Sequence, residues 1–135
     1  MQGAFATRTS QGRITVALQA IPMGEDLLVA LHGGDRSHIG AVAVSQPRPS
    51  LSAGEPRSAT TSVIALVGHK EDELARQLAQ RVAKEAGVTT TVACGIHLDG
   101  ISAREIGQVI QMAEEVTRRL IAWKKRGFEP ENPHG

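Results

Sequence analysis

Three of the five histidines stand at the ends of apolar segments, and they carry the clearest chemical signal in the sequence. They are His38, His69 and His97, and each lies within two residues of a glycine. An imidazole can bind a metal ion, or it can exchange hydrogen bonds with a polar ligand. A neighbouring glycine lets a ligand come close to the main chain. Residues of this kind indicate a binding site, provided that the fold brings them together.

The elements that must position these histidines follow from the periodicity of apolar residues. Segment 13–21 alternates apolar and polar residues, as a half-buried strand does, and segment 70–86 repeats apolar residues every four positions, as a helix does. Ser102 and Glu105 form a capping box that begins a second helix, which ends near Lys124. The strands expected from such patterns cover residues 13–21, 27–31, 39–44, 60–67 and 88–94.

This order of elements, β-β-β-β-α-β-α, predicts an α+β fold. We expect a two-layer sandwich with a mostly antiparallel sheet of about five strands and two helices on one face. Residues 1–128 should form a single domain, and residues 129–135 should form a flexible tail. Segment 45–59 contains three prolines and is expected to be a long loop.

Strand pairing decides whether the histidines meet. If segments 39–44 and 60–67 pair antiparallel and helix 70–86 is a crossover, all three histidines reach one rim of the sheet. With Asp99 or Asp35 nearby, His38, His69 and His97 would then suit a divalent metal ion. The alternative is that they are ordinary turn histidines that bond local backbone. Both interpretations remain open from the residues alone.

A second group of residues is suited to phosphate. Arg48 and Ser50 lie in a proline-rich stretch, and Ser58 and Thr60 follow in the next segment. Guanidinium groups match phosphate oxygens, and Lys70 adds a charge at the start of a helix. The three acidic residues 71–73 oppose an anion there, and a solvated loop is the alternative interpretation.

Composition excludes several classes of protein. A net charge of +1 and only 2% aromatic residues argue against a nucleic-acid partner. No stretch approaches the ~18 apolar residues of a membrane span, and the N-terminus lacks a signal-peptide core, so we expect a cytoplasmic protein with no membrane partner. The single cysteine, Cys94, lies in an apolar stretch and is expected to be a core thiol. Segments 39–44 and 63–67 look apolar on both faces, which predicts a homodimer.

The same motifs resemble a known family. Segments 33–44, 47–50, 58–60, 68–72 and 95–99 are similar, as a set, to the small D subunit of gallate and hydroxyarylic-acid decarboxylase systems. The likeness extends over roughly residues 25–110, and one departure is Ser37, where the family pattern has proline. This family accompanies UbiD-type decarboxylases, which use prenylated FMN.

The resemblance implies a cofactor chaperone that is not itself an enzyme. It would bind reduced prenylated FMN and deliver it to the apo-form of a UbiD-type decarboxylase, with a flavin prenyltransferase as a further candidate partner. The cofactor-binding residues that it implies are His38, Arg48, Ser50, Ser58, Thr60, His69, Lys70 and His97. An apolar wall for the flavin would come from Ile39, Ile96 and Leu98, or from a partner subunit. A small metal-dependent enzyme using the three histidines and Asp99, or a purely structural subunit, remain as alternatives.

Overall fold

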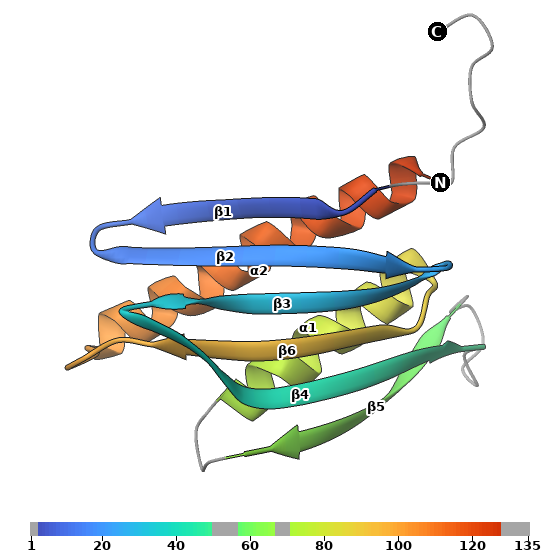
Figure 1. Ribbon diagram of the computed structural model, residues 1–135. Coiled ribbons are helices and arrows are strands. Elements are labelled where there is room, and N and C mark those ends of the chain that lie inside the picture. The colour runs from blue at the N-terminus through green and yellow to red at the C-terminus, as the bar shows by residue number, and fades with distance from the viewer. Residues whose placement is uncertain (1–2, 50–56, 67–70, 128–135) are drawn as a thin grey trace, which may run out of the picture.

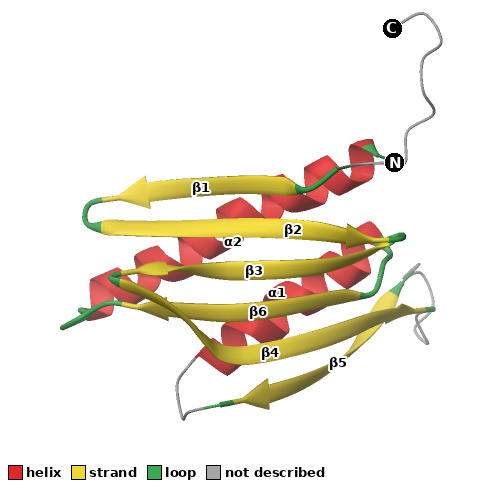
Figure 2. Ribbon diagram, viewed as in Figure 1, coloured by secondary structure: helices red, strands yellow, loops and turns green. Residues whose placement is uncertain are grey.

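The computed structural model describes residues 3–49, 57–66 and 71–127 and has a six-stranded sheet with two helices (Figure 1). The elements are β1 (Phe5–Gln11), β2 (Ile14–Met23), β3 (Asp26–Gly34), β4 (Arg36–Arg48), β5 (Ser58–Ala65), α1 (Glu71–Ala86), β6 (Thr90–His97) and α2 (Ala103–Arg126). Both helices lie on the same face of the sheet, as Figure 2 shows. The predicted two-layer α+β sandwich is therefore confirmed.

The sheet has the strand order β1-β2-β3-β6-β4-β5. The β3–β6 pair is parallel, and the other four pairs of neighbours are antiparallel. β4 and β5 pair antiparallel, which meets the condition set in the sequence analysis, and β5 and β6 run in the same direction on either side of β4. The helix-side residues of the central strands, among them Val16, Leu31 and Val92, are almost fully buried beneath the helices.

The sequence analysis missed one strand and misjudged one loop. The missed strand is β1, which contains a single large apolar residue, Phe5, in an otherwise small or polar run. Phe5 stacks against Trp123 of α2 with 5.1 Å between ring centroids, so a contact with the far end of the chain holds this edge strand. Residues 45–48 and 58–59, expected in a loop, belong instead to β4 and β5. Pro47 is tolerated because the β4–β6 ladder ends at Ser45.

The other sheet face is uncovered in the described part of the chain. It exposes Ile21, Leu28, Val44 and Ile64. We call this surface the open sheet face. No described helix is long and apolar enough to span a membrane.

Candidate functional site

The turn between β3 and β4 wraps around the end of β6 and fixes His97. Gly34 pairs with His97 on one side and Arg36 pairs with it on the other. The Asp35 amide donates a hydrogen bond to the His97 carbonyl over 2.6 Å. Gly34 has a φ of 75°, and a Cβ at this position would lie 2.2 Å from the same carbonyl oxygen. Only glycine fits this close approach, which explains the glycine at position 34.

His38 lies where the β4–β6 ladder is irregular, and this irregularity turns it toward α1. The register shifts between Ser37 and Ala41, as it does at a β-bulge. His38 Nε2 lies 3.0 Å from Glu71 Oε1 and 3.2 Å from Oε2. Glu71 begins α1, and its Oε1 also accepts a hydrogen bond from the Ile96 amide over 3.3 Å. One carboxylate thus connects β4, α1 and β6.

Two glycines make room for this contact. A Cβ on Gly40 would lie 1.6 Å from Glu71 Oε2, and a Cβ on Gly95 would lie 1.7 Å from the His38 carbonyl oxygen. The sequence analysis proposed that the glycines admit a ligand to the main chain. In the structure, Gly40 and Gly95 admit side-chain and backbone atoms of the site itself.

A polar cluster surrounds the second histidine. His97 Nε2 lies 2.8 Å from Asp99 Oδ1 and 3.2 Å from an Arg36 guanidinium nitrogen. The hydrogen bond from His97 lowers the pKa of Asp99, and the charges of Arg36 and Arg13 add to this effect. Arg36 is 72% exposed on its side chain, so its guanidinium is accessible to an anion at this rim.

The loop after β6 is anchored by Arg13, which extends from the β1–β2 turn. Its guanidinium donates to both oxygens of Glu105, over 2.7 and 3.0 Å, and to the Asp99 carbonyl over 2.9 Å. The predicted capping box between Ser102 and Glu105 is confirmed. Arg13, followed by the Ser102 backbone, lowers the pKa of Glu105 to about 2. These contacts hold segment 99–102 against the start of α2.

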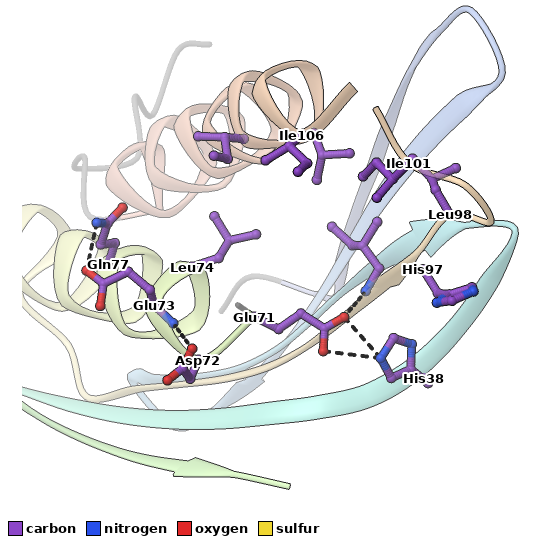
Figure 3. A pocket seen from close by; sticks show the side chains of 13 residues that line it. His38, Glu71, Asp72, Glu73, Leu74, Gln77, His97, Leu98, Ile101 and Ile106 are labelled. Carbon is purple, nitrogen blue, oxygen red and sulfur yellow. Dashed lines mark hydrogen bonds and ion pairs between the residues drawn. The ribbon is translucent and has the colours of Figure 1, made fainter. Parts of the chain in front are cut away.

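A cavity of about 630 Å³ opens between the first turns of α1 and α2, beside the histidines (Figure 3). Its volume falls within the roughly 300–1,000 Å³ of typical small-molecule sites. The polar lining residues are His38, Glu71, Asp72, Glu73, Gln77 and His97. The apolar lining residues are Leu74, Ile96, Leu98, Ile101, Ile106, Val109 and Ile110. The expected apolar residues Ile96 and Leu98 line the cavity, whereas Ile39 does not and is 59% exposed.

The structure brings together two of the three predicted histidines. The rings of His38 and His97 lie 6.4 Å apart, centroid to centroid. His69, Lys70 and Ser50 lie outside the described residues. Within the described ranges, no group of three histidine, cysteine or acidic residues has the geometry of a metal site. The predicted ligands His38 and His97 contact Glu71 and Asp99 respectively, and the metal-dependent alternative gains no support there.

Three of the predicted phosphate residues, Arg48, Ser58 and Thr60, lie away from the cavity. Arg48 donates to the Thr60 hydroxyl over 2.9 Å, and Arg48 pairs with Ser58 across the β4–β5 ladder. Ten residues of strand separate Arg48 from His38, which corresponds to about 30 Å. One bound nucleotide cannot contact both ends of β4.

Three contributors to the site were not identified from the sequence. Arg36 approaches His97 across 61 residues, and Arg13 approaches Glu105 across 92, so no local pattern indicates either contact. The third is Ile110, which is 41% exposed and lines the cavity. Cys94 is a buried core thiol as expected, and burial raises its pKa to about 12.

Comparison with known proteins adds three findings. Residues 10–125 match the family model described as a prenylated flavin chaperone LpdD-like domain. The chain is 27% identical over 120 residues to Protein LpdD of Lactiplantibacillus plantarum, covering 88% of this chain and 82% of that protein. Its fold is similar to that of a chain in a chaperone complex for yeast 20S proteasome assembly, with a TM-score of 0.56 and 11% sequence identity. The match covers 88% of this chain and 96% of that chain.

Proposed function

This chain belongs to the LpdD-like prenylated flavin chaperone family, and from that premise we propose that it binds reduced prenylated FMN and delivers it to an apo UbiD-type decarboxylase. The observation that carries this proposal is the cavity between α1 and α2. It lies within the residues that match the family, and His38 and His97 are among its lining residues. The role is that of a carrier without a chemical step of its own.

The cavity has the properties that a flavin carrier needs. Its size suits a small molecule, its wall is largely apolar, and a few polar groups gather at one end, which is the usual composition of a cofactor site. Ile101 and Ile110 are 40% and 41% exposed, so the apolar wall reaches the surface. A ligand held there could leave toward a docked partner without opening the core. The bound cofactor would supply the decarboxylation chemistry in the decarboxylase, and this chain would hold it and shield it.

The phosphate of the cofactor is proposed to bind at Arg36. This guanidinium contacts His97, which lines the cavity, and it is largely exposed. Arginine is well suited to a phosphate because its nitrogens form two parallel hydrogen bonds. The residues predicted from the sequence, Arg48, Ser58 and Thr60, remain a competing proposal for the other end of β4. The two arginines can be tested against each other.

We propose a homodimer formed through the open sheet face. Two neighbouring rows of cross-strand partners on this face contain no charged residue. The first row is Ile21, Leu28, Thr91, Val44 and Ser62, and the second row is Gln19, Ala30, Ala93, Val42 and Ile64. Two copies can meet there without burying a charge, which would be costly. The decarboxylase, and the flavin prenyltransferase that would load the carrier, would then approach the cavity from the helix side.

The test is an anaerobic titration of the purified protein with reduced prenylated FMN, followed by mixing with the apo-decarboxylase. We expect saturable binding and decarboxylase activity that rises with added carrier. His97→Ala should weaken binding. His32→Ala is the matched control, because His32 bonds Ser37 and Gln19 and does not line the cavity. Binding without activation of the decarboxylase would reject the delivery role, and no binding would reject the carrier itself.

A further inference from the structure

The cavity has two chemically different halves. One half is the aliphatic wall, formed by Leu74, Leu98, Ile101, Ile106, Val109 and Ile110. The other half carries the carboxylates of Glu71, Asp72 and Glu73 together with the two histidines. In Figure 3, Ile101 and Ile106 lie across the cavity from Glu71 and Asp72. A ligand with one apolar end and one charged end can therefore enter in only one favourable orientation.

The acidic half disfavours a phosphate inside the cavity. No lysine or arginine is among the described residues that line it. A hydrogen bond from Arg76 lowers the pKa of Glu73, which keeps this carboxylate ionised near neutral pH. A phosphate beside ionised carboxylates would be repelled. The phosphate end of a flavin nucleotide must accordingly face outward, toward Arg36, and the ring end must face inward.

The aliphatic wall contains no aromatic ring among its described residues. Phe5 and Trp123 stack on each other between β1 and α2 and do not line the cavity. A planar flavin gains most from stacking on an aromatic face, and this wall offers none. Branched leucine and isoleucine side chains instead pack well against a bulky, branched hydrocarbon. The wall is thus better matched to the prenyl-derived part of the cofactor than to the planar rings.

We propose that the aliphatic wall recognises the five-carbon, isoprenoid-derived part of the cofactor and so distinguishes prenylated FMN from plain FMN. This inference rests on the proposed function and assigns the selectivity to Leu74, Ile101, Ile106 and Ile110. A hydrophobic pocket discriminates by about 10- to 200-fold for one methylene. Prenylated FMN has five more carbons than plain FMN, and these carbons would contact a partly exposed wall. The protein should then bind prenylated FMN on the order of 100-fold more tightly than plain FMN.

The experiment compares the dissociation constants of reduced prenylated FMN and reduced FMN, measured anaerobically on the full chain. The test variant is Ile101→Ser with Ile110→Ser, because both side chains are partly exposed and their loss leaves the core intact. The control is Met23→Ser, which removes a side chain that is 64% exposed at the opposite end of the sheet. Thermal unfolding and circular dichroism verify that all proteins are folded.

We expect the wild type and Met23→Ser to prefer the prenylated form on the order of 100-fold. In the double variant, the ratio of the two dissociation constants should fall at least ten-fold. The reason is that the variant binds the prenylated form more weakly while its affinity for reduced FMN stays the same. Equal weakening of both ligands, or equal binding of both by the wild type, would overturn the inference and leave the carrier function standing. Failure of the wild type to bind either ligand would instead reject the proposed function.

Discussion

His38 and Glu71 are 33 residues apart in the sequence and meet with 3.0 Å between Nε2 and Oε1. Because Glu71 also accepts a hydrogen bond from the Ile96 amide, this pair connects three elements at the polar end of the cavity. The side chain of Glu71 is only 13% exposed, and that of His38 is 34% exposed. This contact between β4 and α1 is therefore largely shielded from solvent.

Gly95→Ala should destabilise the protein by about 1–3 kcal/mol, because the new Cβ would lie 1.7 Å from the His38 carbonyl oxygen and backbone must move. Chemical denaturation measures this effect. Gly107→Ala is the control: nothing lies within 4 Å of its Cβ position in α2, so it should stabilise by about 0.5–1 kcal/mol. Equal free energies of unfolding for the two variants would contradict the close approach between Gly95 and the His38 carbonyl oxygen.

Gly40→Ala should affect binding more than stability. Its Cβ would meet the end of the Glu71 side chain, which can rotate away, rather than backbone. The displaced carboxylate would leave His38 and the Ile96 amide, and the polar end of the cavity would change shape. We expect weaker binding of reduced prenylated FMN with a melting temperature close to that of the wild type. Unchanged affinity would mean that Glu71 does not shape the binding site.

Arg36→Ala should weaken binding of reduced FMN on the order of ten-fold, the typical loss for a hydrogen bond to a charged group. Reduced riboflavin, which has no phosphate, should bind the variant and the wild type equally. Arg48→Ala is the matched comparison, because Arg48 lies at the other end of β4. If Arg48→Ala produces the loss and Arg36→Ala does not, the phosphate binds where the sequence alone suggested.

Stability toward acid should depend on Glu105. Its pKa is lowered to about 2 in the folded protein, from an ordinary value near 4.5, chiefly by the Arg13 hydrogen bonds. A lowered pKa stabilises the fold above the ordinary value, and this contribution is lost as the pH falls from about 4.5 toward 2. Glu105→Gln should therefore have a lower melting temperature than the wild type at pH 7, with the difference shrinking toward pH 2. A difference in melting temperature that stays constant from pH 7 to pH 2 would contradict the lowered pKa of Glu105.

Ile64→Lys should convert a dimer to a monomer, because it places a charge in an uncharged row of the open sheet face. Light scattering should give twice the 14.3 kDa chain mass for the wild type and a single chain mass for the variant. Gln111→Lys, at an exposed position of α2 on the helix side of the sheet, should remain dimeric. A wild type of 14.3 kDa would reject the dimer.

The sequence predicts those parts of the site that follow from strand order. His38 and His97 could be placed at one rim because each lies at the end of an apolar strand, and antiparallel pairing with a crossover helix leaves few arrangements. Arg36 and Arg13 could not be found in this way, since both act through contacts more than 60 residues away. The edge strand β1 was missed because it is stabilised by the contact between Phe5 and Trp123 rather than by its own pattern.

The insertion of β6 between β3 and β4 has a consequence for how the protein forms. The β1–β2–β3 meander pairs only near neighbours in sequence, so it can fold while the rest of the chain is still being synthesised. β4 is connected to β3 by the Asp35 turn but meets its inner neighbour only when residues 90–97 arrive. Such long-range pairing is slow. A nascent or truncated chain that ends before His97 should therefore capture no cofactor, and competence to bind should appear late, when the last strand has entered the sheet and α2 has packed beside α1.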